Sequence, residues 1–219
     1  MNLPTLQKKK VWHVGSPKSA RTRASSSQEG TLLSVSEHPQ AWTRIARLGG
    51  RETWELVRTD RTPGVFVNMH AIPEATKNAL IAASGLVAPV RVYIARWTAG
   101  DEYGDDETYE MTFTTRAAAE REIEDFEDAE IREQTGWKAT PELNRLWKAN
   151  FSGRLAASFV GEFALLTVLE RMNRYDGAWW NDVLDPYALS APRGGIFQKR
   201  LNEWLAMPAR TLPREWRDE

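Results

Sequence analysis

The feature of this sequence that most constrains its fold is the irregular order in which short strand-like and helix-like patterns follow one another. Residues 10–14, 31–36 and 53–58 alternate apolar and polar side chains over a few positions, as short strands do. Residues 39–48 instead repeat apolar side chains at helical spacing, after a proline and before two glycines. Because no regular strand–helix–strand alternation runs through the chain, we predict an α+β fold with a mixed or largely antiparallel sheet and several inserted helices.

The rest of the chain continues this mixed pattern. Further strands are predicted at residues 90–97 and 108–114, which a turn joins as a hairpin, and at residues 178–180 and 195–197. Further helices are predicted at residues 73–85, at residues 115–133 and from Pro141 to about residue 166, with Gly153 as a point where the last one divides. The carboxylates of residues 115–133 then form the solvated face of an acidic amphipathic helix.

Length and composition favour one domain over residues 1–219, in a chain long enough to bury roughly 70% of its unfolded surface. The absence of cysteine excludes disulfides, thiolate metal sites and a cysteine nucleophile, and fits a reducing compartment. No apolar run approaches the roughly 20 residues of a membrane span. A secretory signal has an apolar stretch after its basic N-terminal residues. No such stretch follows the N-terminal lysines of this sequence. We therefore expect a cytoplasmic protein that contacts no membrane.

Charge is unevenly placed along the chain. Residues 1–70 carry 11 basic and 5 acidic side chains, whereas residues 71–140 carry 7 basic and 15 acidic ones. The first 28 residues contain six basic side chains and no acidic one, which suits contact with phosphate of a nucleotide or a nucleic acid. Residues 1–10, with three consecutive lysines, are equally consistent with a mobile basic arm.

The common catalytic motifs are absent from the sequence. It contains no phosphate-binding loop, no GxGxxG, no HExxH and no GxSxG. His13, His38 and His70 are too scattered for a spaced metal motif, so no metal is expected. His38 precedes a proline and is interpreted as a cap or turn residue, and His70 receives no functional assignment.

Three segments, taken in order, carry a resemblance to a known family. They are residues 11–16 (VWHVGS), residues 30–42 with GTLLSVS followed by HPQAW, and residues 174–197, which hold RYDGAWWND and then SAPRGGIF. In this order they resemble the ADP-ribosyltransferase fold, particularly its bacterial and phage toxin-like members. The resemblance covers about a third of the chain, at its two ends. It implies an ADP-ribosyltransferase-like sheet core and NAD as the substrate that donates ADP-ribose.

The resemblance also implies roles for individual residues. Cleavage of the nicotinamide–ribose bond builds positive charge on the ribose, which a preorganised carboxylate stabilises. Asp182 would supply that carboxylate, and His13 would hold a ribose hydroxyl. Where the family usually has glutamate, this chain has aspartate, with Asp185 as the alternative. The residues expected to bind NAD are Gly15, which lets the nicotinamide amide approach closely, His13 at the ribose, Ser34, Ser36 and Trp42 as candidates to cover the ring, Arg21 and Arg23 at the diphosphate, and Ser16.

Several functions remain open from the sequence. The leading one is transfer of ADP-ribose to a macromolecular acceptor, protein or nucleic acid, by a toxin of a toxin–antitoxin or phage-defence system that an antitoxin protein restrains. With water as acceptor, the same site would be an NAD glycohydrolase. The alternatives are a non-catalytic binding module on a degenerate fold of this kind, and a metal-independent ribonuclease. Arg193 is interpreted as a phosphate or substrate contact or as an exposed turn residue.

Overall fold

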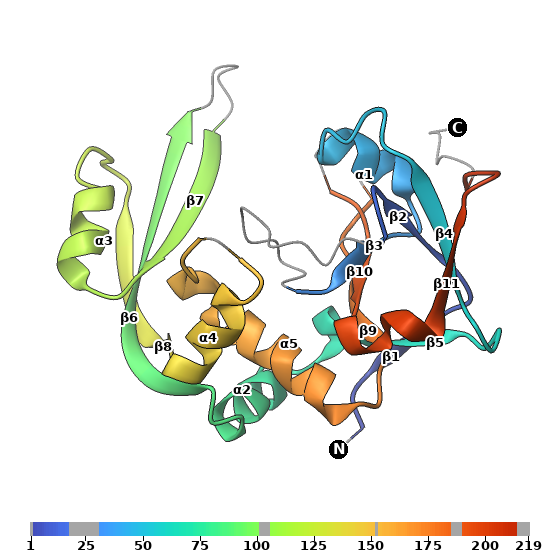
Figure 1. Ribbon diagram of the computed structural model, residues 1–219. Coiled ribbons are helices and arrows are strands. Elements are labelled where there is room, and N and C mark those ends of the chain that lie inside the picture. The colour runs from blue at the N-terminus through green and yellow to red at the C-terminus, as the bar shows by residue number, and fades with distance from the viewer. Residues whose placement is uncertain (1, 18–30, 101–105, 152, 185–189, 214–219) are drawn as a thin grey trace. The chain divides into compact units, whose positions relative to one another are not determined.

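The structure is a computed structural model that describes residues 2–17, 31–100, 106–151, 153–184 and 190–213. Its described helices and strands confirm the α+β class (Figure 1). The chain divides into two compact units. Of the described residues, unit 1 comprises 2–17, 31–77, 166–184 and 190–213, and unit 2 comprises 78–100, 106–151 and 153–165. Among the described helices, none has both the length and the apolar character that crossing a bilayer requires.

Unit 1 contains a five-stranded sheet assembled from distant parts of the chain (Figure 1). Its strands, in spatial order, are β1 (Thr5–Lys8), β5 (Gly64–Asn68), β9 (Gly177–Trp180), β10 (Arg193–Ile196) and β3 (Leu33–Val35). Strands β5 and β9 run parallel, and the other neighbouring pairs run antiparallel. The carboxyl ends of β3, β5 and β9 and the amino end of β10 therefore share one edge, which we call the carboxyl edge.

A second, three-stranded sheet of unit 1 has the antiparallel order β11 (Trp204–Pro208), β4 (Thr53–Arg58) and β2 (Val11–Val14). Two backbone hydrogen bonds join it to the first sheet: Trp12 N donates to the Ser36 carbonyl and Ser36 N donates to the Trp12 carbonyl, both at 2.9 Å. Helix α1 (Pro39–Ile45) follows β3, with the proline in its first turn. The two sheets are thus continuous at the position of Ser36.

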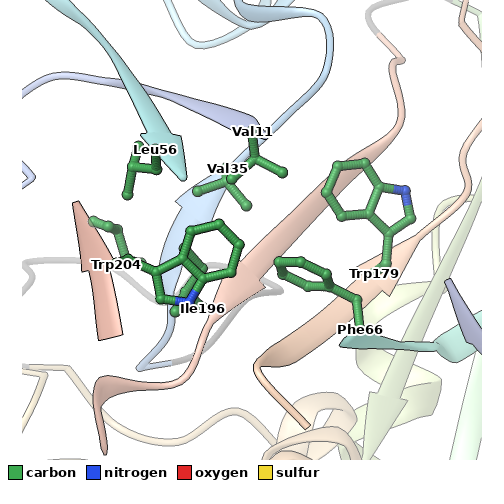
Figure 2. Close-up of a cluster of buried hydrophobic side chains, with 8 residues drawn as sticks. Val11, Val35, Leu56, Phe66, Trp179, Ile196 and Trp204 are labelled. Atoms are coloured by element: carbon green, nitrogen blue, oxygen red, sulfur yellow. The ribbon is translucent and has the colours of Figure 1, made fainter. Parts of the chain in front are cut away.

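A single apolar cluster packs between these strands (Figure 2). Phe66 is fully buried, and its ring meets those of Trp179 and Trp204 edge-on at centroid distances of 5.6 and 5.9 Å. Gly194 allows this packing, because a Cβ there would lie 2.2 Å from the Trp179 indole. The cluster fixes β5, β9, β10 and β11 against one another, and so sets the strand ends from which the site is built.

Asp176 secures the start of β9. Its buried carboxylate forms an ion pair with Arg58 and accepts a hydrogen bond from Val65 N at 2.7 Å. Its backbone N–H donates to the Val65 carbonyl, also at 2.7 Å. Arg58 further pairs with Asp60 and Glu203, and the hydrogen bonds from Arg58 lower the pKa of the Asp60 carboxyl far below its ordinary value.

Unit 2 is built on a three-stranded antiparallel sheet with the order β7 (Asp106–Phe113), β6 (Val87–Gly100) and β8 (Glu130–Ala139). Its helices are α3 (Arg116–Glu122) and α4 (Pro141–Lys148), whereas α2 (Glu74–Ala83) and α5 (Val160–Met172) each span a division between the units. In this unit, Trp147 is buried, stacks on Phe151 at 4.0 Å and donates its indole N–H to the Gly153 carbonyl at 2.9 Å.

Two expectations about the elements are wrong. Residues 115–133 do not form one helix: α3 ends at Glu122, and residue 130 begins β8. The acidic run between these elements repels itself at helical spacing, and ten consecutive pairings with β6 favour the strand. The N-terminal residues 1–10 are not simply a mobile arm, because Thr5–Lys8 form β1, and Lys8 pairs with Glu37 at 2.5 Å. Gly153 does lie at a division between helices, as predicted.

Candidate active site

The polar residues of the candidate site lie where strands end at the carboxyl edge. His70 follows β5 by two residues and Asp182 follows β9 by two residues. Arg193 is the first residue of β10, and Ser36 directly follows β3. Because β5 and β9 are parallel neighbours and β10 runs back beside β9, residues distant in sequence arrive at the same edge. This is where open sheets containing parallel strands commonly bind ligands.

Asp182 lies between two basic side chains. Its Oδ2 is 2.9 Å from Nη1 of Arg193, and its Oδ1 is 3.4 Å from Nε2 of His70. The first distance is that of a charge-assisted hydrogen bond, whereas the second is an electrostatic contact slightly longer than a hydrogen bond. Both carboxylate oxygens therefore have a basic neighbour, and the orientation of the carboxylate is set from two sides.

Arg193 is held by aromatic rings as well as by Asp182. Its side chain is 14% exposed, and its guanidinium carbon lies 5.6 Å from the ring centroid of Trp42 and 5.7 Å from that of Trp180. These distances are within the range of cation–π attraction. Trp180 is also the cross-strand neighbour of Arg193 in the sheet. The interpretation of Arg193 as an exposed turn residue is therefore wrong.

Ser36 and Trp42 converge on the carbonyl oxygen of Pro192. Ser36 Oγ donates to it at 2.8 Å, and Trp42 Nε1 donates to it at 3.3 Å. The Ser36 hydroxyl also accepts a hydrogen bond from His38 N at 2.9 Å and is buried. Both side chains fasten Pro192, the residue before Arg193. Within the described chain, Ser36 therefore acts as a structural link. The N–H of Trp42 is used in the same way, which leaves its ring for contact with a ligand.

His13 contacts strand β3 at the backbone of Ser34. Its Nδ1 lies 2.7 Å from the Ser34 carbonyl. Because a carbonyl only accepts hydrogen bonds, Nδ1 carries the proton, and Nε2 of the neutral ring is then an acceptor. The role expected for His13 at a ribose hydroxyl stays a prediction.

Gly15 has a conformation that favours glycine, with φ of 115°. Its N–H donates a hydrogen bond to the Glu52 carbonyl at 2.8 Å. Ser16, the next residue, is exposed. The expected contributions of Arg21, Arg23 and Asp185 lie outside the described residues.

His70 is the residue of this site that sequence reasoning missed. It lies in a short 3₁₀ turn, Met69–Ala71, directly after β5, a strand that the sequence analysis did not predict. The signal that points to it is the apolar run Val65–Val67 followed by Asn68, which reads as a strand ending in a cap. With β5 recognised, a histidine at its carboxyl end becomes a candidate.

Two further observations concern the titratable side chains of the described residues. Among the residues that the structure describes, no group of three or more histidine, cysteine, aspartate or glutamate side chains is arranged to hold a metal ion. Burial lowers the pKa of His38 below its ordinary value of 6.5, against the opposing effect of Glu37, so His38 is disposed to the neutral form.

Comparison of the chain with protein-family models, with curated proteins and with solved structures gives no match. The function is therefore inferred from the arrangement of the residues themselves.

Proposed function

We propose that the chain is an NAD-dependent ADP-ribosyltransferase that transfers ADP-ribose from NAD to a macromolecular acceptor. The observation that carries the proposal is the Asp182 carboxylate, held by Arg193 at the carboxyl edge with the indoles of Trp42 and Trp180 beside that guanidinium. A fixed carboxylate is what a cationic ribose transition state requires, because its orientation costs no reorganisation during the reaction.

In the proposed reaction, the C1′–N bond of NAD breaks and its electron pair neutralises the pyridinium nitrogen, so that nicotinamide leaves. Asp182 stabilises the positive charge that develops on the ribose. An acceptor lone pair forms the new bond to C1′, and a proton leaves the acceptor. In this proposal His13 holds a ribose hydroxyl, and the Trp42 ring supplies an aromatic surface near the nicotinamide.

The toxin-like role belongs to the same proposal. A cytoplasmic enzyme of this kind would act on a protein or nucleic-acid acceptor and would be restrained by an antitoxin protein. The runner-up is a non-catalytic binding module on a degenerate fold. What favours it is that the Ser36 hydroxyl, expected to serve NAD, is hydrogen-bonded within the chain.

Incubation of the purified protein with adenine-labelled NAD and a lysate of the expression host tests the proposal. We expect label on protein or nucleic acid with the wild type, and loss of that label in Asp182→Asn and His13→Ala. Asp60→Asn is the matched control, because it removes an exposed carboxylate of the same unit. Free nicotinamide without transferred label indicates a glycohydrolase. NAD that binds, seen by tryptophan fluorescence, but stays intact indicates the binding module, and absence of binding contradicts both.

A further inference from the structure

The histidine beside Asp182 suggests how the acceptor loses its proton. We propose that His70 is the general base that deprotonates the attacking group, so that the acceptor is a neutral hydroxyl or N–H group and not a carboxylate. This inference rests on the proposed function. It names a chemical class of acceptor and a catalytic residue that the family resemblance does not supply.

The carboxylate sets the state of the ring. His70 presents Nε2 to Oδ1 of Asp182, and a carboxylate only accepts. When this contact shortens to a hydrogen bond in the complex, the neutral ring carries its proton on Nε2, and Nδ1 is the nitrogen with a lone pair. An imidazole oriented in this way by a carboxylate is a common arrangement for general-base catalysis. The 3.4 Å separation is consistent with an enzyme without substrate, where such contacts are often long and tighten in the complex.

The imidazole is the more accessible of the two groups. The His70 side chain is 49% exposed, whereas that of Asp182 is 21% exposed and that of Arg193 is 14% exposed. A group on a macromolecule can therefore reach the imidazole from solvent.

The turn that carries His70 is fastened on both sides. Asn68 accepts a hydrogen bond from Ala71 N at 3.3 Å through its side chain, and Met69 is 2% exposed. Asn68 is also the cross-strand neighbour of Trp179 on β9, the strand that leads to Asp182. The histidine and the carboxylate are thus positioned by the same pair of strands, as catalytic groups need to be.

The chemistry balances with these groups alone. The C1′–N bond of NAD breaks and nicotinamide takes its electron pair, while the acceptor oxygen or nitrogen forms the bond to C1′. The proton of the acceptor moves to Nδ1 of His70 and then to water, so one proton is released per turnover. A nucleophile that already carries negative charge and no proton, such as azide, needs no base.

The test compares nucleophiles on the same enzyme. NAD is incubated with wild-type protein in water, in dilute methanol and with sodium azide, and ADP-ribose, its methyl glycoside and ADP-ribosyl azide are quantified by mass spectrometry. In His70→Ala and His70→Gln we expect the water and methanol products to fall about 100-fold, the range for loss of a general base. The azide product should change little, and added imidazole should restore the methanol product in His70→Ala.

Three controls separate the possible outcomes. His38→Ala removes a histidine of the same unit and should leave all products unchanged, and Asp182→Asn should suppress all three. A parallel fall of every product in both His70 variants, at unchanged unfolding midpoints, would mean that His70 only supports the site, and no fall would mean that it takes no proton; either result overturns the inference alone. A wild type that makes none of the products overturns the proposed function, and the inference with it.

Discussion

Replacement of Asp176 by alanine tests whether the start of β9 is secured as the structure indicates. The change removes one partner of a buried ion pair with Arg58 and leaves Val65 N without its acceptor. Breaking a buried pair from one side costs about 3–5 kcal/mol, and an unsatisfied buried N–H costs about 1–3 kcal/mol. Arg58 keeps Asp60 and Glu203 as partners, so its charge stays compensated. We therefore expect the sum to lie near the lower limits, with the free energy of unfolding about 3–4 kcal/mol smaller.

Urea unfolding followed by tryptophan fluorescence measures this loss. With a slope of about 3 kcal/mol per molar, the upper end of the range for small proteins, the midpoint should fall by about 1 M. Asp60→Ala is the matched control, since it removes a partner of Arg58 that is exposed, and it should shift the midpoint far less. Equal shifts for the two variants would refute the reasoning, because they would mean that the burial of Asp176 contributes nothing.

Three further predictions concern packing and pH. Gly194→Ala should lower the thermal midpoint in calorimetry, because its Cβ would meet the Trp179 indole at 2.2 Å. Trp147→Ala should lower the free energy of unfolding by about 3–5 kcal/mol in urea titrations, the range for a large buried aromatic residue that leaves a cavity. Burial lowers the pKa of His38, so the unfolded chain binds more protons at this residue than the folded chain does. The free energy of unfolding should therefore fall as the pH drops below 6.5, and His38→Gln should weaken that fall.

The sequence predicted helices and strands correctly where the pattern of apolar residues is strong within one short stretch. The strand at 53–58 and the helix beginning at Pro39 appear where the pattern predicted them. Strand β1 was missed because three consecutive lysines begin at its last residue, which hid a four-residue strand in a basic segment. The prediction of a helix over residues 123–133 was wrong for a different reason. The side chains there follow a helical pattern, but from residue 130 onward the pairing with β6 decides the conformation. Pairing with a distant strand is invisible to a local pattern.

The candidate site was predictable only in part. Asp182 and Trp42 were selected from the sequence, and the structure links them through Arg193. That His70 and Arg193 both contact Asp182 could not be found that way, because their proximity depends on the order of strands in the sheet. No motif with fixed spacing describes residues that meet only through strand order.

The aspartate at position 182, where the resemblance leads one to expect glutamate, has a physical account in this geometry. A shorter side chain has fewer rotamers to fix, and Arg193 and His70 fix those that remain. Arg193 at the same time offsets the negative charge that the proposed chemistry needs.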